Sequence, residues 1–188
     1  MKIRLMKPVF HLILVCLLLV PAVGHTDQSD ERLDELFITL QISLDASVLQ
    51  ETESSIWKIW YESGRDDINV LMEEGGRAAQ AGEMAIAESL YSKVIETLPE
   101  FSEGWNRRAT VRFYQNDYDG SLADIQRTLY LEPRHFGAFW GLGMILGSKG
   151  QYSAAIEAFE RLIELKPNTP DARPRIEMLR EEMAKSAV

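Results

Sequence analysis

The chain has 188 residues, of which 46% are hydrophobic and 26% are charged, a composition compatible with a folded helical or mixed domain. Twenty lysine and arginine residues stand against 29 aspartate and glutamate residues, which gives a formal net charge of −9. Because a phosphate backbone attracts basic surfaces, this charge argues against nucleic acid as a partner. The single cysteine, Cys16, excludes a disulfide within the chain.

The first 24 residues are predicted to be a targeting segment. Basic residues precede an apolar run and small residues follow it: Lys2, Arg4 and Lys7, then Val9 to Val20, then Ala22-Val23-Gly24. This order is typical of a secretory signal peptide, and we expect cleavage after Gly24. Twelve helical residues span about 18 Å, less than the hydrocarbon core of about 30 Å, so a retained anchor is the less favoured alternative.

Removal of this segment takes away three basic residues and no acidic ones. The mature chain would keep 17 lysine and arginine residues against 29 acidic residues, with a formal charge of −12 and no cysteine. A chain without cysteine is compatible with an oxidising compartment. We therefore expect a periplasmic or secreted protein of bacterial type, which meets a membrane only through the signal segment during export.

Residues 25–65 are predicted to form a helical pair. The first helical face carries Leu33, Leu36, Phe37 and Leu40, and the second stretch, about 46–63, carries Ile56, Trp57, Ile59, Trp60 and Tyr61. The pair is either a degenerate repeat or a cap over the open end of the repeats that follow. We favour the cap, because Glu53 occupies a position where a repeat needs a small residue.

Residues 66–169 contain a repeat with a period of 34 residues. Pro99, Pro133 and Pro167 each close an apolar segment, and they define units of residues 68–101, 102–135 and 136–169. Large and small residues recur at matching places in these units: Leu71, Trp105 and Phe139; Gly75, Ala109 and Gly143; Ala87, Ser121 and Ala155; Tyr91, Ile125 and Phe159. Proline interrupts a helix, so each unit is predicted to be two helices and a turn.

This order of large, small, small and large residues before proline resembles the tetratricopeptide repeat. The resemblance covers residues 68–169, with departures at Ala78 and Arg112, where the family usually has an aromatic residue. It implies an all-α fold, a right-handed superhelical solenoid of antiparallel helix pairs. First helices are expected at about 68–80, 102–115 and 136–149. Residues 170–188 are expected to add one capping helix that buries Ile176, Met178, Leu179 and Met183.

The same resemblance implies a binding groove on the exposed faces of the first helices. Its expected residues are Asn69, Met72 and Gly76 in the first unit, Asn106, Arg107, Thr110 and Phe113 in the second, and Trp140, Met144 and Gly147 in the third. Family members that bind heat-shock chaperones hold a terminal carboxylate with lysine, arginine and asparagine, but this groove has no lysine at the matching places. A carboxylate clamp of that kind is therefore not expected.

The aromatic and methionine residues of the groove instead predict an apolar strip for a short helix or an extended peptide. The alternative is that the Trp140 and Phe113 rings only pack against neighbouring helices. Four arginines are candidate anchors for acidic groups of a partner: Arg107, Arg108, Arg112 and Arg134.

No catalytic residues, metal ligands or cofactors are predicted, and we do not expect an enzyme. His135 is interpreted as a locally hydrogen-bonded boundary residue, because it lacks the partners that metal binding or acid–base chemistry requires. Gly141, Gly143 and Gly147 are read as sites of close helix crossing rather than a phosphate loop. The acidic residues Asp117, Asp119 and Asp124 are read as helix-starting residues rather than a calcium loop.

Two functions follow from these patterns. The first is an exported protein-interaction module, an envelope adaptor or assembly factor that binds a protein or peptide partner in the groove. The second is a self-associating structural subunit, suggested by the aromatic residues Trp57, Trp60 and Tyr61. The partner is not identified by any motif.

Overall fold

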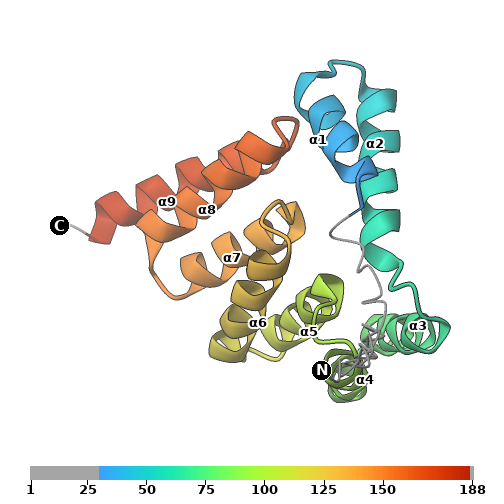
Figure 1. Ribbon diagram of the computed structural model, residues 1–188. Helices are drawn as coiled ribbons and strands as arrows, with labels where there is room; N and C mark the ends of the chain where they lie inside the picture. The colour runs from blue at the N-terminus through green and yellow to red at the C-terminus, as the bar shows by residue number, and fades with distance from the viewer. Residues whose placement is uncertain (1–29, 187–188) are drawn as a thin grey trace, which may run out of the picture.

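The computed structural model describes residues 30–186, and the predicted signal segment lies outside them. This part of the chain consists of helices and connections, without strands (Figure 1). The helices are α1 (Arg32–Ile42), α2 (Ala46–Tyr61), α3 (Asp66–Gln80), α4 (Met84–Thr97), α5 (Ser102–Tyr114), α6 (Tyr118–Leu131), α7 (Phe136–Ser148), α8 (Tyr152–Leu165) and α9 (Ala172–Ser186). The predicted all-α solenoid is confirmed, since three antiparallel pairs, α3–α4, α5–α6 and α7–α8, stack in sequence.

Small residues at the predicted crossings allow the two helices of each pair to approach closely. Ala87, Ser121 and Ala155 are fully buried. A Cβ atom added to Gly75 would lie 2.6 Å from the Tyr91 ring, and one added to Gly143 would lie 2.6 Å from the Phe159 ring. The recurring small and large residues therefore face each other across the helix pair, as the repeat pattern requires.

Each turn between paired helices contains a residue with left-handed backbone geometry. Gly82 has φ +80° and Gly150 has φ +72°, while Asn116 takes this place in the second repeat with φ +63°. The Asp117 side chain accepts a hydrogen bond from the backbone amide of Gly120 and so caps α6. The predicted capping role of Asp117 is confirmed.

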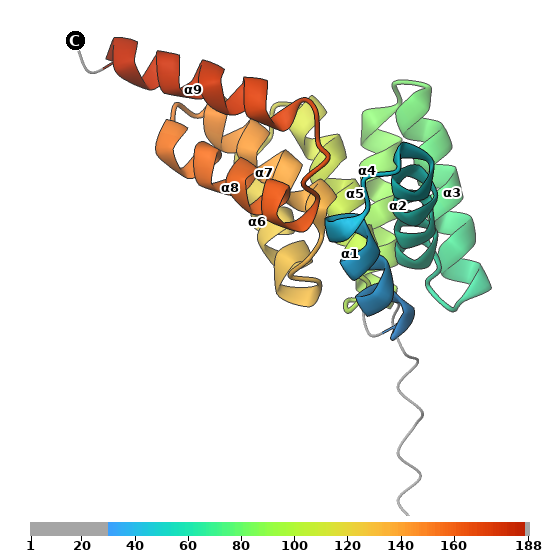
Figure 2. The same cartoon turned by 90° about the horizontal axis from the view of Figure 1, so that it is seen from above.

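The C-terminal helix α9 covers α8, with Ala172, Ile176 and Leu179 buried (Figure 2). The expectation that Met178 and Met183 are also buried is wrong, because each is 43% exposed. The helix is therefore held by a narrower apolar face than its sequence pattern predicted. No helix within residues 30–186 is both long and apolar enough to span a bilayer.

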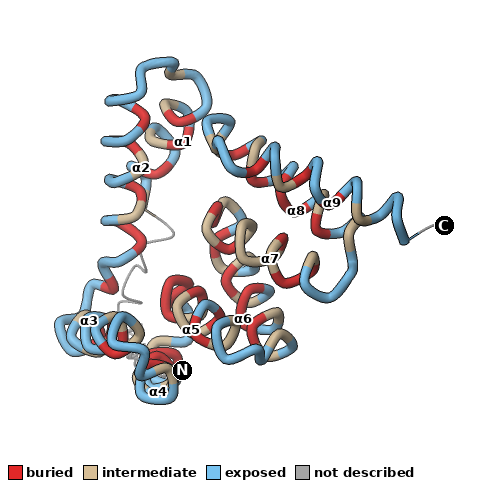
Figure 3. The backbone as a smooth tube through the Cα atoms, turned by 180° about the vertical axis from the view of Figure 1, so that it is seen from behind, coloured by how far each residue is buried: buried red, intermediate tan, exposed pale blue. Residues whose placement is uncertain are grey.

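The N-terminal pair forms a hairpin, α1–α2, whose position differs from the expected cap. The hairpin rises beside the repeats and α1 approaches the end of α8, rather than covering the outer face of α3 and α4 (Figure 1). Its buried residues share one hydrophobic cluster with α7, α8 and α9, which includes Phe37, Trp60, Phe136 and Leu162. The buried positions of the hairpin accordingly face the rest of the chain (Figure 3). Contacts between residues far apart in sequence therefore hold the hairpin against the last repeat and the C-terminal helix.

Candidate functional site

The first helices of the repeats, α3, α5 and α7, carry the surface that the sequence predicts to be a groove, here called the groove face. Between α5 and α7 this face contains a cavity of about 180 Å³, the α5–α7 pocket. Five predicted site residues line it: Asn106, Thr110, Phe113, Trp140 and Met144. The structure thus brings together residues from two repeats at one opening.

Glycines on α7 create the space in this pocket. Gly137 and Gly141 both line the cavity, and a Cβ atom added to Gly141 would lie 3.0 Å from Ile125 on the pocket floor. The Trp140 ring packs edge-on against Phe159, with 5.3 Å between ring centroids, yet it stays partly exposed. The ring therefore packs against a neighbouring helix and also forms a wall of the pocket.

A second cavity of about 320 Å³ lies between α3 and α5, here called the α3–α5 pocket. Four more predicted site residues line it, Asn69, Met72, Gly76 and Arg107, whereas Gly147 lines neither pocket. Asn69 also holds the connection between α2 and α3, because its Oδ1 accepts hydrogen bonds from the backbone amide and the hydroxyl of Ser63, at 3.1 and 2.8 Å. Met72 is only 5% exposed and contributes to the floor of the pocket.

A buried carboxylate forms hydrogen bonds with one lining residue of each pocket. Glu103, at the start of α5, is fully buried and accepts a hydrogen bond from Asn106 Nδ2 at 2.9 Å and one from Arg107 Nε at 2.5 Å. Burial lowers the pKa of Arg107 to about 10, because removal from water disfavours the guanidinium charge. Glu103 thereby fixes one predicted site residue in each pocket.

His135 completes this network from the start of α7. Its Nδ1 accepts a hydrogen bond from the backbone amide of Ala138 at 3.1 Å, so in the neutral ring the proton is on Nε2. Nε2 donates it to Glu103 Oε2, 3.0 Å away. The predicted local hydrogen bond of His135 is confirmed, and the ring also has a single buried carboxylate partner, Glu103. Its partner lies one repeat upstream, which sequence proximity did not indicate.

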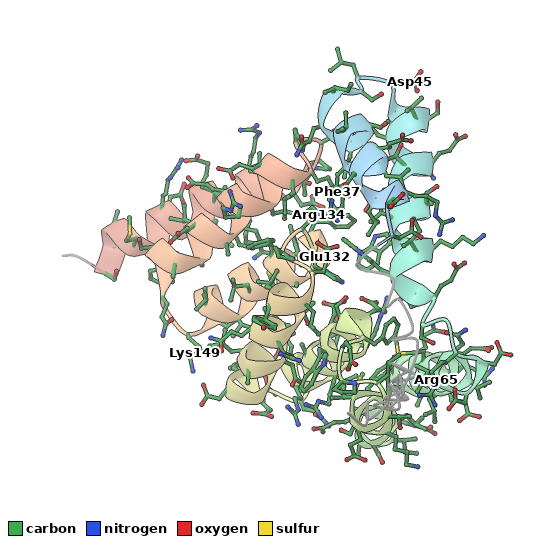
Figure 4. The ribbon with its side chains drawn as sticks, viewed as in Figure 1. Phe37, Asp45, Arg65, Glu132, Arg134 and Lys149 are labelled. Carbon is green, nitrogen blue, oxygen red and sulfur yellow. The ribbon has the colours of Figure 1, made fainter. Side chains whose placement is uncertain are left out.

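The arginines proposed as anchors for a partner are engaged within the chain. Arg108 and Arg112 both pair with the buried Asp124, at 2.7 and 3.0 Å, and Arg112 also pairs with Glu88. Arg134 lies at the hairpin, where it pairs with Asp34 at 2.6 Å, hydrogen-bonds Glu132 and covers the Phe37 ring (Figure 4). Their expected role as free anchors is therefore corrected to a structural one.

Two hairpin residues that were not predicted as site residues lie against the groove face. Tyr61 lines the α3–α5 pocket, and the Arg107 guanidinium lies over its ring at 4.5 Å from the centroid. Trp57 packs against Phe136 with 5.2 Å between ring centroids. The sequence signal was the four-residue spacing of these aromatic residues, which puts them on one face of α2. The surface that this face meets could not be read from that spacing.

Tyr91, which also lines the α3–α5 pocket, gives the protein an expected sensitivity to alkaline pH. Burial and, second, the charge of Glu103 raise the pKa of Tyr91 to about 12, above the value of 10.0 expected in the unfolded chain. The folded state therefore favours the neutral phenol. The resulting stability is complete below pH 10 and is lost as the pH rises from 10 towards 12.

Absorbance at 295 nm during an alkaline titration would measure this effect. We expect one tyrosine to ionise near pH 12, about two pH units above the ordinary value of 10.0, and Tyr91→Phe to remove that late transition. A Tyr130→Phe variant is the matched control and should retain it. A late transition that persists in Tyr91→Phe would contradict the assignment.

The described residues 30–186 contain no group of three or more histidine, cysteine, aspartate or glutamate side chains placed to hold a metal ion. Asp119 pairs with Lys149 at 2.5 Å and Asp124 is used by the arginines of α5, so the acidic residues near α6 stabilise the repeat. The groove face offers apolar walls with a few amide and hydroxyl groups at their edges. Such a surface can bind a protein segment.

A stack of helix pairs with pockets between its first helices defines the class of helical-repeat binding proteins. Comparison with known sequences supports that class: residues 106–172 match the family model described as tetratricopeptide repeat. The chain is 34% identical over 154 residues to a TPR repeat-containing protein of Rhizobium etli, covering 82% of this chain and 76% of that protein. It is also 31% identical over 126 residues to human tetratricopeptide repeat protein 36, covering 65% and 66% of the two chains.

The chain belongs to the tetratricopeptide repeat family. Solved structures show the same fold at low identity. The first TPR of Spaghetti (RPAP3), bound to an HSP90 peptide, aligns with a TM-score of 0.61 and 21% identity, covering 62% of this chain and 93% of that one. The MamA protein aligns with a TM-score of 0.60 and 19% identity, covering 80% of this chain and 84% of that one.

Proposed function

We propose that this chain is an exported protein-interaction module that binds a peptide or protein segment on its groove face. The observation that carries the proposal is that nine of the ten predicted groove residues, all except Gly147, line two pockets on either side of α5. Tetratricopeptide structures solved with an HSP90 peptide and in an Hsp70 complex show that proteins of this fold take up peptides, which supports the same use here.

The α5–α7 pocket limits the chemistry of that partner. Its volume of about 180 Å³ is below the roughly 300–1,000 Å³ typical of small-molecule sites, so it suits one side chain of a larger ligand. Phe113, Ile125, Trp140 and Met144 make most of its walls apolar, while Asn106 and Thr110 add polar groups. We therefore expect a partner segment with an apolar anchor residue.

Export to the cell envelope is part of the proposal and rests on the sequence of residues 1–24. The basic, apolar and small residues there have the order of a signal peptide, and the negative charge of the remaining chain is compatible with a role away from nucleic acid. Cell fractionation together with N-terminal sequencing of the purified protein would test this part. A protein that begins at His25 in the periplasmic fraction is the expected result.

Self-association has less support than partner binding. Two of the three aromatic residues that suggested it pack inside the chain, although Tyr61 is 39% exposed. Trp60 is 1% exposed and stacks on His135 with 4.2 Å between ring centroids. Trp57 is held between the hairpin and α7 by its contacts with Trp60 and Phe136. These two rings are thus used to dock the hairpin.

Substitution at the mouth of the α5–α7 pocket should abolish partner capture. Residues 25–188 serve as bait in an envelope extract, and bound proteins are identified by mass spectrometry. Thr110 is exposed and lines the pocket, so Thr110→Lys places a charged chain at its mouth without disturbing the core. Loss of a central contact of this kind is worth about 2 kcal/mol or more, which weakens binding about 30-fold.

Trp140→Ala should have a comparable effect on binding, although it also removes packing against Phe159, so its thermal stability must be measured alongside. Gln126→Lys, an exposed substitution on α6, is the matched control and should capture the same partner as the original chain. Equal recovery by Thr110→Lys and Gln126→Lys would count against binding on the groove face.

A further inference from the structure

One stripe of α2 lies against the repeats at three points, two on the groove face and one at the end of α8. Glu53, Trp57 and Tyr61 are spaced four residues apart and so project from the same side of the helix. These residues meet α8, α7 and α5 in turn, because α2 runs past the starts of α5 and α7 towards the end of α8. A helix of the chain itself thus borders the surface that the repeats offer to a partner.

Each contact of the stripe has a distinct chemistry. Glu53 forms an ion pair with Lys166, whose side chain is 16% exposed and lies over the Phe136 ring. Trp57 fills the space above Gly137, where an added Cβ atom would come within 2.7 Å of its ring. The third contact is the Tyr61 ring beneath the Arg107 guanidinium. Within the chain, the repeats therefore hold an acid followed by two aromatic residues at helical spacing.

The stripe also forms walls of the cavities around the groove face. Trp57 and Glu53 line a cavity with Trp140 and Gly137, and those two α7 residues line the α5–α7 pocket as well. Tyr61 lines the α3–α5 pocket. A partner that follows the groove face from one pocket to the next must therefore meet α2.

The connection from α2 to α3 is short and polar. Residues 62–65 include Gly64 with φ +69°, and nothing lies within 4 Å of the place where its Cβ would be. The link is held mainly by the Ser63–Asn69 hydrogen bonds. The remaining polar ties of the hairpin to distant helices are few and largely exposed, among them Asp34–Arg134 and the Gln41 bond to the Glu164 carbonyl.

We propose that the α1–α2 hairpin is an internal ligand of the groove face, and that the external partner is an amphipathic helix that displaces it. The partner helix carries an acidic residue and two aromatic residues at four-residue spacing, as α2 does. This inference rests on the proposed function for the existence of a partner. The docking surface and its selectivity are inferred from the contacts of α2 and do not depend on the proposed function.

A peptide of the chain's own residues 30–61, labelled with fluorescein, tests the proposal without an identified partner. Its binding to residues 25–188 is followed by fluorescence anisotropy. In the chain, Trp57→Ala loosens the hairpin and leaves the docking surface unaltered, whereas Lys58→Ala changes an exposed neighbour on α2 and is the matched control. We expect the peptide to bind Trp57→Ala at least tenfold more tightly than the original chain or Lys58→Ala.

Hydrogen exchange measured on the same variants reports whether the hairpin opens by itself. Trp57→Ala should speed exchange in α1 and α2 at least tenfold while α5 and α6 keep their protection. Glu53→Lys in the chain, which places a like charge against Lys166, should act in the same direction. A labelled peptide that itself carries Trp57→Ala should bind at least tenfold more weakly.

The proposal would be overturned if the peptide bound the original chain, Trp57→Ala and Glu53→Lys with equal affinity. It would also be overturned if hydrogen exchange in α1 and α2 accelerated only together with exchange in α5 and α6. Because the probe is a segment of the chain itself, these results do not depend on partner capture. If the peptide binds tightly but no partner is captured from the envelope extract, the proposed function is contradicted and the docking surface for the hairpin is still supported.

Discussion

Replacement of Glu103 by alanine is expected to destabilise the protein by about 3–5 kcal/mol, the usual effect of removing one member of a buried charged network. The carboxylate is fully buried and accepts hydrogen bonds from Asn106, Arg107 and His135. Its removal leaves the His135 Nε2 proton buried without an acceptor and the Arg107 charge without its counter-ion. The loss acts at the junction of two repeats and the hairpin, so it affects all three.

Thermal unfolding followed by circular dichroism would measure this change. For a chain of this size we expect the Tm to fall by about 6–20 °C, since 1 kcal/mol corresponds to roughly 2–4 °C. Glu96→Ala on the exposed side of α4 is the matched control and should stay within about 0.5 kcal/mol of the original protein. A Glu103→Ala protein as stable as the Glu96→Ala control would show that the network contributes no net stability.

The repeat could be read from the sequence because its physical cause is local. A helix pair needs a turn every 34 residues and small residues where its helices cross, and both leave a period in the chain. Gly75 with Tyr91 and Gly143 with Phe159 occupy matching places in their units and make the same contact. The groove residues were predictable for the same reason, because a position within a repeat fixes the face that it occupies.

The position of the hairpin could not be read from the sequence, because it depends on contacts between residues that share no period. Trp60 stacks on His135, and Asp34 pairs with Arg134, 100 residues further along the chain. The pattern of apolar residues predicts that α1 and α2 need a covering surface but does not say which one. The choice is made by the start of α7, where the hairpin buries His135 and Phe136 and Trp57 fills the space above Gly137.

Arg112 shows how a departure from the repeat pattern can be compensated. The family usually has an aromatic residue at this place. The arginine instead reaches Asp124 on α6 at 3.0 Å and Glu88 on α4 at 2.8 Å. An ion-pair network thus connects three helices where an aromatic ring would fill space, and the buried Asp124 has a partner in spite of its burial.

Adjacent glycines on α3 should respond in opposite directions to the same substitution. A Cβ atom at Gly75 would lie 2.6 Å from the ring of Tyr91, which is 2% exposed and has little room to move. Gly75→Ala is therefore expected to destabilise the protein by about 1–3 kcal/mol, the usual effect of overpacking. At Gly76 the nearest atom is the Tyr91 hydroxyl, 3.9 Å away, so Gly76→Ala should gain up to about 1 kcal/mol from helix propensity.

Urea unfolding of both variants measures the difference, and the third repeat provides an independent check. Gly143→Leu meets the Phe159 ring, so we expect a loss at the upper end of about 1–3 kcal/mol or beyond it. Because Gly75 and Gly76 have the same helix propensity and neighbouring positions, a difference of sign between them can come only from the crossing with α4. Equal stabilities of the two alanine variants, or an unchanged Gly143→Leu protein, would contradict close helix crossing as the reason for these glycines.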